Sequence, residues 1–400
     1  MSTFVVTNLN DSGVGSLRAA IQACNNTPVG STNTISFQVS GTINLLSDLP
    51  TIIREVSLMA SGSQPGLSPN VEINFNNKTG LVFGTGSAGS SLYGFSIVNA
   101  SGNGVTLQDS HITLNNNWIG IKLDGSVGAN SGDGVYVSNS SSYNYIGSNP
   151  SGTSNIVTNV ISGNGGNGIS LNGSSYNTIQ SNHIGTDKSG SISVQNGING
   201  IFITSQSSHN LIGGTDYTDS STGAQNNPTG SEGSTTPVFV TPPQGNLISG
   251  NIQNGVKIDT GSEFNTLSGN FVGTTYTGNA PIGNHADGIL IDGANNNALL
   301  GCKFVNNPFV YYNVVSGNGA NGLEIHNANN TTIQANFFGI GANNASIVSN
   351  SLNGILVDGA SQNTQVGGVI PLGNVSAGNL QNGIAVTDTA NGFISFNTFG

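Results

Sequence analysis

The chain has 400 residues, of which only 6% are charged, and it contains 59 Gly and 60 Asn. With a net charge of −11 and only seven Lys and Arg, the chain lacks the basic surface that binds nucleic acid or an anionic membrane. It would also repel a polyanionic substrate. No apolar stretch approaches the ~20 residues that a membrane span needs. Cys24 and Cys302 are too few and too far apart for a disulfide framework.

The N-terminal segment, residues 1–34, is expected to cap the rest of the chain. Ser16-Leu-Arg-Ala-Ala-Ile-Gln22 is typical of a short amphipathic helix with Ser16 as its N-cap. Leu17 and Ile21 would face the core that follows. Residues 35–98 contain less regular apolar runs, which predict short strands.

From residue 104 onward, the pattern Gly-apolar-x-apolar recurs about every 33 residues. Its occurrences begin at Gly104, Gly134, Gly168, Gly200, Gly255, Gly288, Gly322, Gly354 and Gly383. Each unit holds two further apolar runs, so three short strands per unit predict a three-sided coil with alternate side chains inward. The prediction is all-β: one right-handed parallel β-helix solenoid over residues 35–400, with about 12 coils stacked ~4.8 Å apart.

Two details refine this repeat. Asn-Gly pairs such as Asn167-Gly168 and Asn254-Gly255 are expected to supply the positive φ of sharp corners. The units also alternate in type, ending the second strand in Ile184-Gly-Thr or in Ile212-Gly-Gly, so the true repeat is two coils. The C-terminal Phe396-Asn-Thr-Phe-Gly400 stops within a unit, and we expect an uncapped end that a longer chain or another chain covers.

One class of loops varies most between units and is a candidate for binding. Its members are residues 147–159, 213–245, 301–313 and 367–374, of which 213–245 is an insertion. Four rings in these loops form a candidate platform for a sugar face: Tyr217, Phe239, Tyr311 and Tyr312. The alternatives are that these rings pack against the wall of the coil, or that this edge mediates protein assembly.

The position after each Gly-apolar-x-apolar run forms a column along the rod. Four consecutive members are Asp259, Asp292, His326 and Asp358, and Lys257 and Glu324 lie two residues before Asp259 and His326. Turn formation by the side chains is the favoured interpretation. Two alternatives remain: Asp259 and Asp292 bind Ca²⁺, or Asp259, Asp292, His326, Asp358 and Lys257 act in polysaccharide cleavage.

The chain resembles large surface β-helix proteins of bacteria over nearly its whole length. The resemblance is carried by Phe4-Val-Val-Thr-Asn-Leu-Asn-Asp-Ser-Gly-Val-Gly-Ser-Leu-Arg-Ala-Ala-Ile21, Asn182-His-Ile-Gly-Thr-Asp187 and Asn246-Leu-Ile-Ser-Gly-Asn251. Those proteins belong to the pectate-lyase-like right-handed β-helix superfamily, and similar repeats occur in proteins of large DNA viruses. Lyases of the superfamily typically use an Arg or Lys base, but Arg18 and Arg54 are the only arginines here and both precede the regular coils.

These observations favour a non-enzymatic surface or virion-surface protein for adhesion, glycan recognition or structural assembly. A polysaccharide lyase or glycoside hydrolase of the pectate-lyase-like superfamily is the alternative. No organic cofactor is required in either case. We expect a glycan or a protein as partner, and an extracellular or virion-surface location, although Met1-Ser-Thr-Phe4 lacks the features of a signal peptide.

Overall fold

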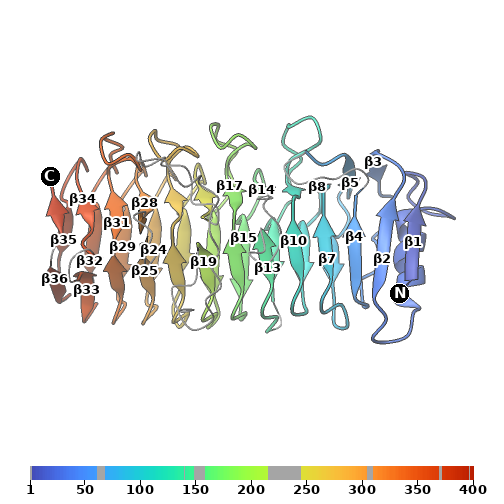
Figure 1. Ribbon diagram of the computed structural model, residues 1–400, viewed down its shortest axis with the longest axis horizontal. Helices are drawn as coiled ribbons and strands as arrows, with labels where there is room; N and C mark the ends of the chain where they lie inside the picture. Colours follow the sequence, from blue (N-terminus) through green and yellow to red (C-terminus); the bar gives the residue numbers. More distant parts are fainter. Residues whose placement is uncertain are drawn as a thin grey trace, which may run out of the picture.

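The computed structural model describes residues 2–60, 68–138, 140–147, 158–214, 245–303, 310–368, 372–395 and 397–400. These residues form a rod of stacked coils, and each complete turn of the chain contributes one strand to each of three parallel sheets (Figure 1). The predicted right-handed parallel β-helix of about 12 coils is therefore confirmed, with 13, 12 and 10 strands in the three sheets.

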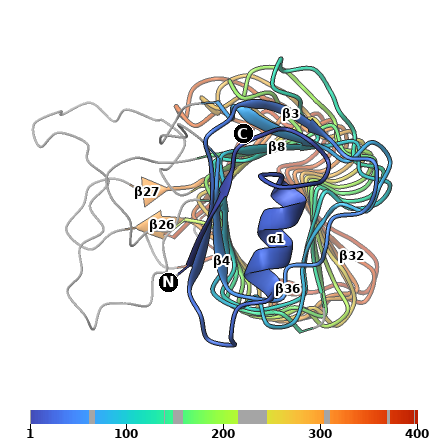
Figure 2. The ribbon, with the colours of Figure 1, turned by 90° about the vertical axis from the view of Figure 1, so that its right-hand side faces the viewer.

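Neighbouring strands in each sheet come from successive coils. In spatial order, sheet A contains β1 (Ser2–Val6), β2 (Asn33–Phe37), β4 (Val56–Met59), β7 (Ser91–Tyr93), β10 (Thr113–Asn115), β13 (Tyr145–Gly147), β16 (Thr178–Gln180), β19 (Leu211–Gly213), β22 (Thr266–Ser268), β25 (Ala298–Leu300), β30 (Thr332–Gln334), β33 (Thr364–Gly367) and β36 (Gly392–Ser395). Sheet B contains β3 (Gly41–Asn44), β5 (Val71–Asn74), β8 (Phe95–Val98), β11 (Trp118–Ile119), β14 (Asn159–Ile161), β17 (Asn182–Ile184), β20 (Leu247–Ile248), β23 (Phe271–Val272), β28 (Asn313–Val315), β31 (Asn336–Phe338), β34 (Val375–Ser376) and β37 (Thr398–Phe399). Sheet C contains β6 (Leu81–Phe83), β9 (Val105–Leu107), β12 (Val135–Val137), β15 (Ile169–Asn172), β18 (Ile201–Thr204), β21 (Val256–Ile258), β24 (Ile289–Asp292), β29 (Leu323–His326), β32 (Ile355–Asp358) and β35 (Ile384–Val386). A separate antiparallel pair, β26 (Cys302–Lys303) and β27 (Val310–Tyr311), projects from the coil (Figure 2).

The core fills the inside of the coil because alternate side chains of every strand point inward. In β18, Ile201 and Ile203 are fully buried, whereas Phe202 between them is partly exposed on the outer face. The parallel register repeats this pattern from coil to coil, so the recurring Gly-apolar-x-apolar runs become continuous columns of Val, Ile and Leu. Each such side chain contributes about 1.5–3 kcal/mol by leaving water.

The one helix among the described residues, α1 (Leu17–Asn25), lies across the N-terminal end of this core (Figure 2). The side chain of Ser16 accepts a hydrogen bond from the Ala19 backbone N–H, as expected of an N-cap. Leu17 and Ile21 are fully buried against the first coil. The predicted helical cap is thus present, and β1, which precedes α1, already pairs with β2 in sheet A.

Asparagine columns join the coils inside the corners. Asn182, which is fully buried, donates from Nδ2 to Asn246 Oδ1 of the next coil at 2.9 Å and to the Ile146 carbonyl at 2.8 Å. Asn159 of the preceding coil donates in turn to Asn182 Oδ1. Members of the four columns include Asn117, Asn159, Asn182, Asn246, Asn270, Asn313, Asn336 and Asn374; Asn130, Asn164, Asn196, Asn251, Asn284, Asn318 and Asn350; Asn144, Asn177, Asn210, Asn265 and Asn297; and Asn167, Asn199, Asn254, Asn321 and Asn353. The high Asn content therefore satisfies the backbone polar groups of the corners.

The expectation that the Asn-Gly pairs supply positive φ is wrong. Neither Asn167 nor Gly168 has a positive φ, and the same holds for Asn254 and Gly255. Glycine is needed there because the coils approach closely: a Cβ on Gly168 would lie 2.6 Å from the carbonyl oxygen of Gly200. Corners that do require positive φ use other glycines, such as Gly185.

The two-coil repeat is visible in the loops that leave sheet B. Loops of similar form follow β11, β17, β23 and β31, which are alternate strands of that sheet, and each is closed by one antiparallel bridge such as Thr186 to Ser193. Adjacent loops also contact each other, since the Tyr276 N–H donates to the Gly190 carbonyl at 2.9 Å. The loops therefore form one continuous edge along the rod (Figure 1).

Candidate functional site

The candidate site lies on the outer face of sheet C, across strands β21, β24, β29 and β32. The strand register places Asp292 beside His326 and His326 beside Asp358, and Asp259 follows β21 at the equivalent position. The alignment that the repeat spacing predicts for these four residues is therefore observed. We call Lys257, Asp259, Asp287, Asp292, Glu324, His326 and Asp358 the ionisable cluster; the whole chain has only 7 Lys and Arg, 18 Asp and Glu and 5 His.

Lys257 partly neutralises the first part of the cluster, which holds two carboxylates. Its Nζ lies 3.9 Å from Asp259 Oδ1 and 3.4 Å from Asp292 Oδ2. Lys257 points outward from the middle of β21, so its ammonium group reaches the carboxylates that end its own strand and the next. All three side chains are between one quarter and one third exposed, so these pairs stabilise the fold only weakly and remain accessible to a ligand.

Glu324, His326 and Asp358 form the second part. His326 Nδ1 lies 2.9 Å from Asp358 Oδ1, across the β29–β32 pair. Glu324 and His326 are two residues apart on β29 and so share its outer face. One ligand-type atom from each of the three residues lies within 4.8 Å of the others, and all three side chains are half-buried.

The pKa values of Glu324 and His326 are shifted upward. Burial, together with the nearby carboxylates of Asp287 and Asp358, raises the pKa of Glu324 to about 7. The hydrogen bond to Asp358 raises the pKa of His326. Near neutral pH, Glu324 is therefore divided between its acid and its carboxylate form, beside an imidazole that the Asp358 carboxylate holds toward the cationic form.

Asp287 is a member of the cluster that the sequence reasoning missed. It occupies the place that Asn holds in the neighbouring coils, directly before Gly288, and it accepts hydrogen bonds from the backbone and side-chain N–H groups of Asn321. Asn321 also donates to Glu324 Oε2 at 2.9 Å, so one amide links the two acids. Burial raises the pKa of Asp287. The signal available in the sequence was Asp287 before the repeat glycine Gly288, where the other repeat glycines from Gly255 to Gly383 are preceded by Asn.

Neither part of the cluster fits the predicted Ca²⁺ well. At Asp259 and Asp292, the Lys257 ammonium already occupies the position between the two carboxylates. At the triad, His326 offers nitrogen, whereas Ca²⁺ prefers a shell of six to eight oxygens. We therefore derive no chemical step through a metal ion.

The predicted aromatic platform falls mostly outside the described residues. Tyr217 and Phe239 lie there entirely, and Tyr311 is described only as backbone in β27. Tyr312 stacks on Phe337 of sheet B, with ring centroids 4.1 Å apart and planes at 14°. One face of the Tyr312 ring is thus used in packing, which is the alternative that the sequence left open for these rings.

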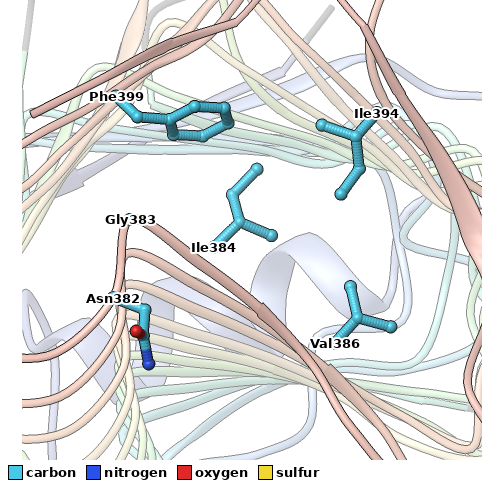
Figure 3. A pocket seen from close by; sticks show the side chains of 6 residues that line it. All are labelled: Asn382, Gly383, Ile384, Val386, Ile394 and Phe399. Atoms are coloured by element: carbon cyan, nitrogen blue, oxygen red, sulfur yellow. The ribbon is translucent and has the colours of Figure 1, made fainter.

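A depression of about 340 Å³ lies at the other end of the rod from α1 (Figure 3). Its lining includes Ile384, Val386, Ile394 and Phe399. Ile384 pairs with Ile355 and Val386 with Val357, which are both buried core residues of the preceding coil. The depression is therefore the apolar end of the core rather than a site with convergent polar groups.

Comparisons with known proteins give only distant similarities. No protein-family profile matches the chain, and no curated protein matches it. Among solved structures, the chain is similar to the mannuronan C-5 epimerase AlgE6 A-module of Azotobacter vinelandii (13% identity, 99% of each chain covered, TM-score 0.47). It is also similar to pectate lyase Pel9A (10% identity, 99% of this chain and 78% of that one, TM-score 0.38) and to the Dettilon tailspike protein (14% identity, 93% and 64%, TM-score 0.44). At identities of 10–14% and TM-scores of 0.38–0.47, these similarities assign no role to this chain. Among the described residues, no helix is long and apolar enough to cross a bilayer.

Proposed function

We propose that this chain is a recognition module of a cell or virion surface, and that it binds a glycan along the outer face of sheet C. The observation that carries the proposal is the triad of Glu324, His326 and Asp358, whose polar atoms lie within 4.8 Å of one another on a partly exposed strand face. Sugar hydroxyls both donate and accept hydrogen bonds. A triad in which Glu324 is divided between its acid and carboxylate forms near neutral pH, beside an imidazole, offers both functions.

The surroundings of the triad suit a neutral or weakly charged polymer. Lys257, Asp259 and Asp292 add one cationic and two anionic groups along the same face, and Phe202 lies beside Lys257 in the register. The net charge of −11 opposes a strongly anionic ligand. Successive coils repeat at ~4.8 Å on a rigid frame, so a linear ligand would meet polar groups at regular intervals.

A second candidate function is polysaccharide cleavage. The specific observation in its favour is the pKa of about 7 at Glu324, with a second carboxyl, Asp358, within 4.8 Å. A carboxyl group poised near the working pH is suited to proton transfer, and two facing carboxyls are the usual equipment of glycoside hydrolysis. In this role Glu324 would be the general acid or base, and His326 would position Asp358.

The deciding experiment is incubation with a panel of neutral and acidic polysaccharides, with and without Ca²⁺. Retention on the polymer and release of new chain ends are followed in parallel. Glu324→Gln and Asp358→Asn remove the charges of the triad, and Glu263→Gln, an acid outside the triad beside Asn295 and Asn296, is the matched control. A chain lacking residues 215–244 tests the loop in which Tyr217 and Phe239 lie.

Retention without cleavage, weakened in the triad variants but not in Glu263→Gln, supports the binding module. Cleavage that disappears in Glu324→Gln supports the enzyme instead. Retention that depends only on residues 215–244 moves the site from sheet C to the loop. If the chain is neither retained on any polymer nor cleaves one, both proposed functions are contradicted.

A further inference from the structure

An aromatic ladder runs along the corner between sheets C and A, away from the ionisable cluster. Five rings from successive coils stack on one another: His111, Tyr143, Tyr176, His209 and Phe264. Neighbouring centroids are 4.9–5.3 Å apart and neighbouring planes differ by 13–22°. All five side chains are exposed at their edges, so the ladder is open to solvent.

The backbone fixes this stack. All five residues have φ between 56° and 60°, a left-handed conformation that bulky residues rarely adopt. Tyr143 and Tyr176 have φ of 58° and 59°, so their Cα–Cβ bonds leave the corner in the same direction. The Tyr143 N–H donates to the Tyr176 carbonyl at 3.1 Å, which locks the two corners together. Strained residues of this kind tend to mark functional positions.

We propose that Tyr143 and Tyr176 form an oxidative cross-linking site, at which a one-electron oxidant joins the two phenol rings as dityrosine. Their centroids are 5.3 Å apart and their planes differ by only 13°, so the two phenol rings are stacked nearly parallel, one over the other. The rings are 50% and 47% exposed, which lets an oxidant reach both phenols and lets the rings tilt together. This inference is independent of the proposed glycan binding.

The chemistry balances with a peroxide as the terminal oxidant. Each phenol loses one electron and one proton to give a tyrosyl radical with spin density on the carbons ortho to oxygen. One Cε of each ring then forms a new C–C bond, and each ring regains its phenol form as the hydrogen on the bonded carbon moves to the oxygen. In total two electrons and two protons leave the pair, and they reduce one molecule of hydrogen peroxide to two of water.

The product would tie one coil to the next with a covalent bond. Residues 143 and 176 are 33 positions apart, so the link closes a long loop in the unfolded chain, as a disulfide would. Among the described residues, Cys24 is a free, buried thiol. The dityrosine bond would therefore be a covalent constraint of a type that the described coils do not otherwise have.

The test treats the purified full chain with a peroxidase and hydrogen peroxide at low protein concentration. The expected result is dityrosine fluorescence from a monomeric product, with a peptide pair joining Tyr143 to Tyr176 and lacking two hydrogen atoms. Tyr176→Phe should reduce this product to background. Tyr145→Phe is the matched control, because Tyr145 lies on the same coil between Thr113 and Thr178 and faces no tyrosine.

The cross-linked protein should also unfold several degrees higher than the untreated chain, and Tyr176→Phe should lose that gain. A linkage of Tyr176 to His209, a link confined to covalent dimers, or equal yields from the wild type and Tyr176→Phe would each overturn the proposal. Circular dichroism of the untreated Tyr176→Phe and Tyr143→Phe variants establishes that both are folded, so that the missing product reports the missing phenol.

Discussion

The two halves of the rod share one frame but present different surfaces. In coils that contain β10 to β22, the corner between sheets C and A carries aromatic rings, and the middle of sheet C presents Tyr136 and Phe202, with the buried Ser170 between them. In coils that contain β25 to β33, the same corner position is Asn296, Asn330 and Asn363, and sheet C carries the ionisable cluster except Lys257 and Asp259, which precede Phe264 in the last coil of the first half. The inward residues do not change in character across this boundary.

This difference shows that the inward residues, which determine the fold of the solenoid, and the outward residues, which determine its surface, can vary independently. The corner needs a left-handed residue in both halves, with φ of 59° at Asn296 and 57° at Phe264. Asn meets that need with little strain, whereas an aromatic residue costs about 1 kcal/mol or more. The aromatic rings of the first half are therefore present at a cost in backbone strain, which the Asn residues of the second half largely avoid.

The largest effect on the free energy of unfolding is expected from substitutions in the asparagine columns, which both halves share. Asn182→Ala and Asn336→Ala each remove three donated hydrogen bonds inside a corner. Each should lower the free energy of unfolding by about 3 kcal/mol, because buried carbonyl groups lose their partners. Urea unfolding of both variants checks this, and a large loss in only one half would break the idea of a common frame.

The next largest effect concerns the pH dependence of stability, and it is expected only in the half of the rod that contains Glu324. The pKa of Glu324 is raised to about 7 from 4.5, so the folded state binds the proton more tightly and stability should fall as pH rises from about 4.5 to above 7. Glu324→Gln should remove this slope and gain about 1 kcal/mol at pH 8, after discounting for solvent screening. Unfolding midpoints between pH 4 and 8 measure it, with Glu55→Gln as a control in the first coils. An unchanged slope would contradict the raised pKa.

A smaller effect concerns His326. The hydrogen bond to Asp358 raises its pKa above 6.5, so this pair stabilises the fold fully below pH 6.5 and the contribution is lost as pH rises through the raised value. Asp358→Asn should lower the pKa of His326, which NMR titration of its ring protons reports directly. A His326 titration that is the same in both proteins would mean that Asp358 does not hold the proton.

The smallest effect tests whether the two corner chemistries are interchangeable. Phe264→Asn would extend the amide column of Asn296 and Asn330 by one coil, relieving backbone strain while removing one ring from the stack. The two changes oppose each other, so the free energy of unfolding should rise by less than about 1 kcal/mol. Near-UV circular dichroism should lose intensity at the same time. A loss of stability above about 2 kcal/mol would make the ladder a structural requirement instead.

The sequence predicted the fold because inward apolar residues recur at a fixed interval, and it placed Asp292, His326 and Asp358 side by side because parallel coils keep one register. It did not reveal the asparagine columns, since an Asn in a corner reads equally well as a turn former. Asp287 was missed for the same reason: it looks like one more Asp-Gly turn until its burial is known. Four ladder rings directly precede an Asn, as in Tyr143-Asn144 and Tyr176-Asn177, but sequence alone does not show that they leave the corner in a left-handed conformation.

The asparagine columns also bear on how the rod would respond to force. Each coil is fastened to the next by side-chain amides at several corners, so tension along the axis would be shared among parallel rows of bonds rather than carried by one seam. The row through Asn254 and Asn321 is weaker at Asp287, whose backbone N–H donates to Asn254 Oδ1 but whose side chain only accepts, from Asn321, and so cannot add the second bond that an Asn amide makes. Under load, the joint between β21 and β24 should therefore part before the joints on either side, and the rod should fail at a defined place.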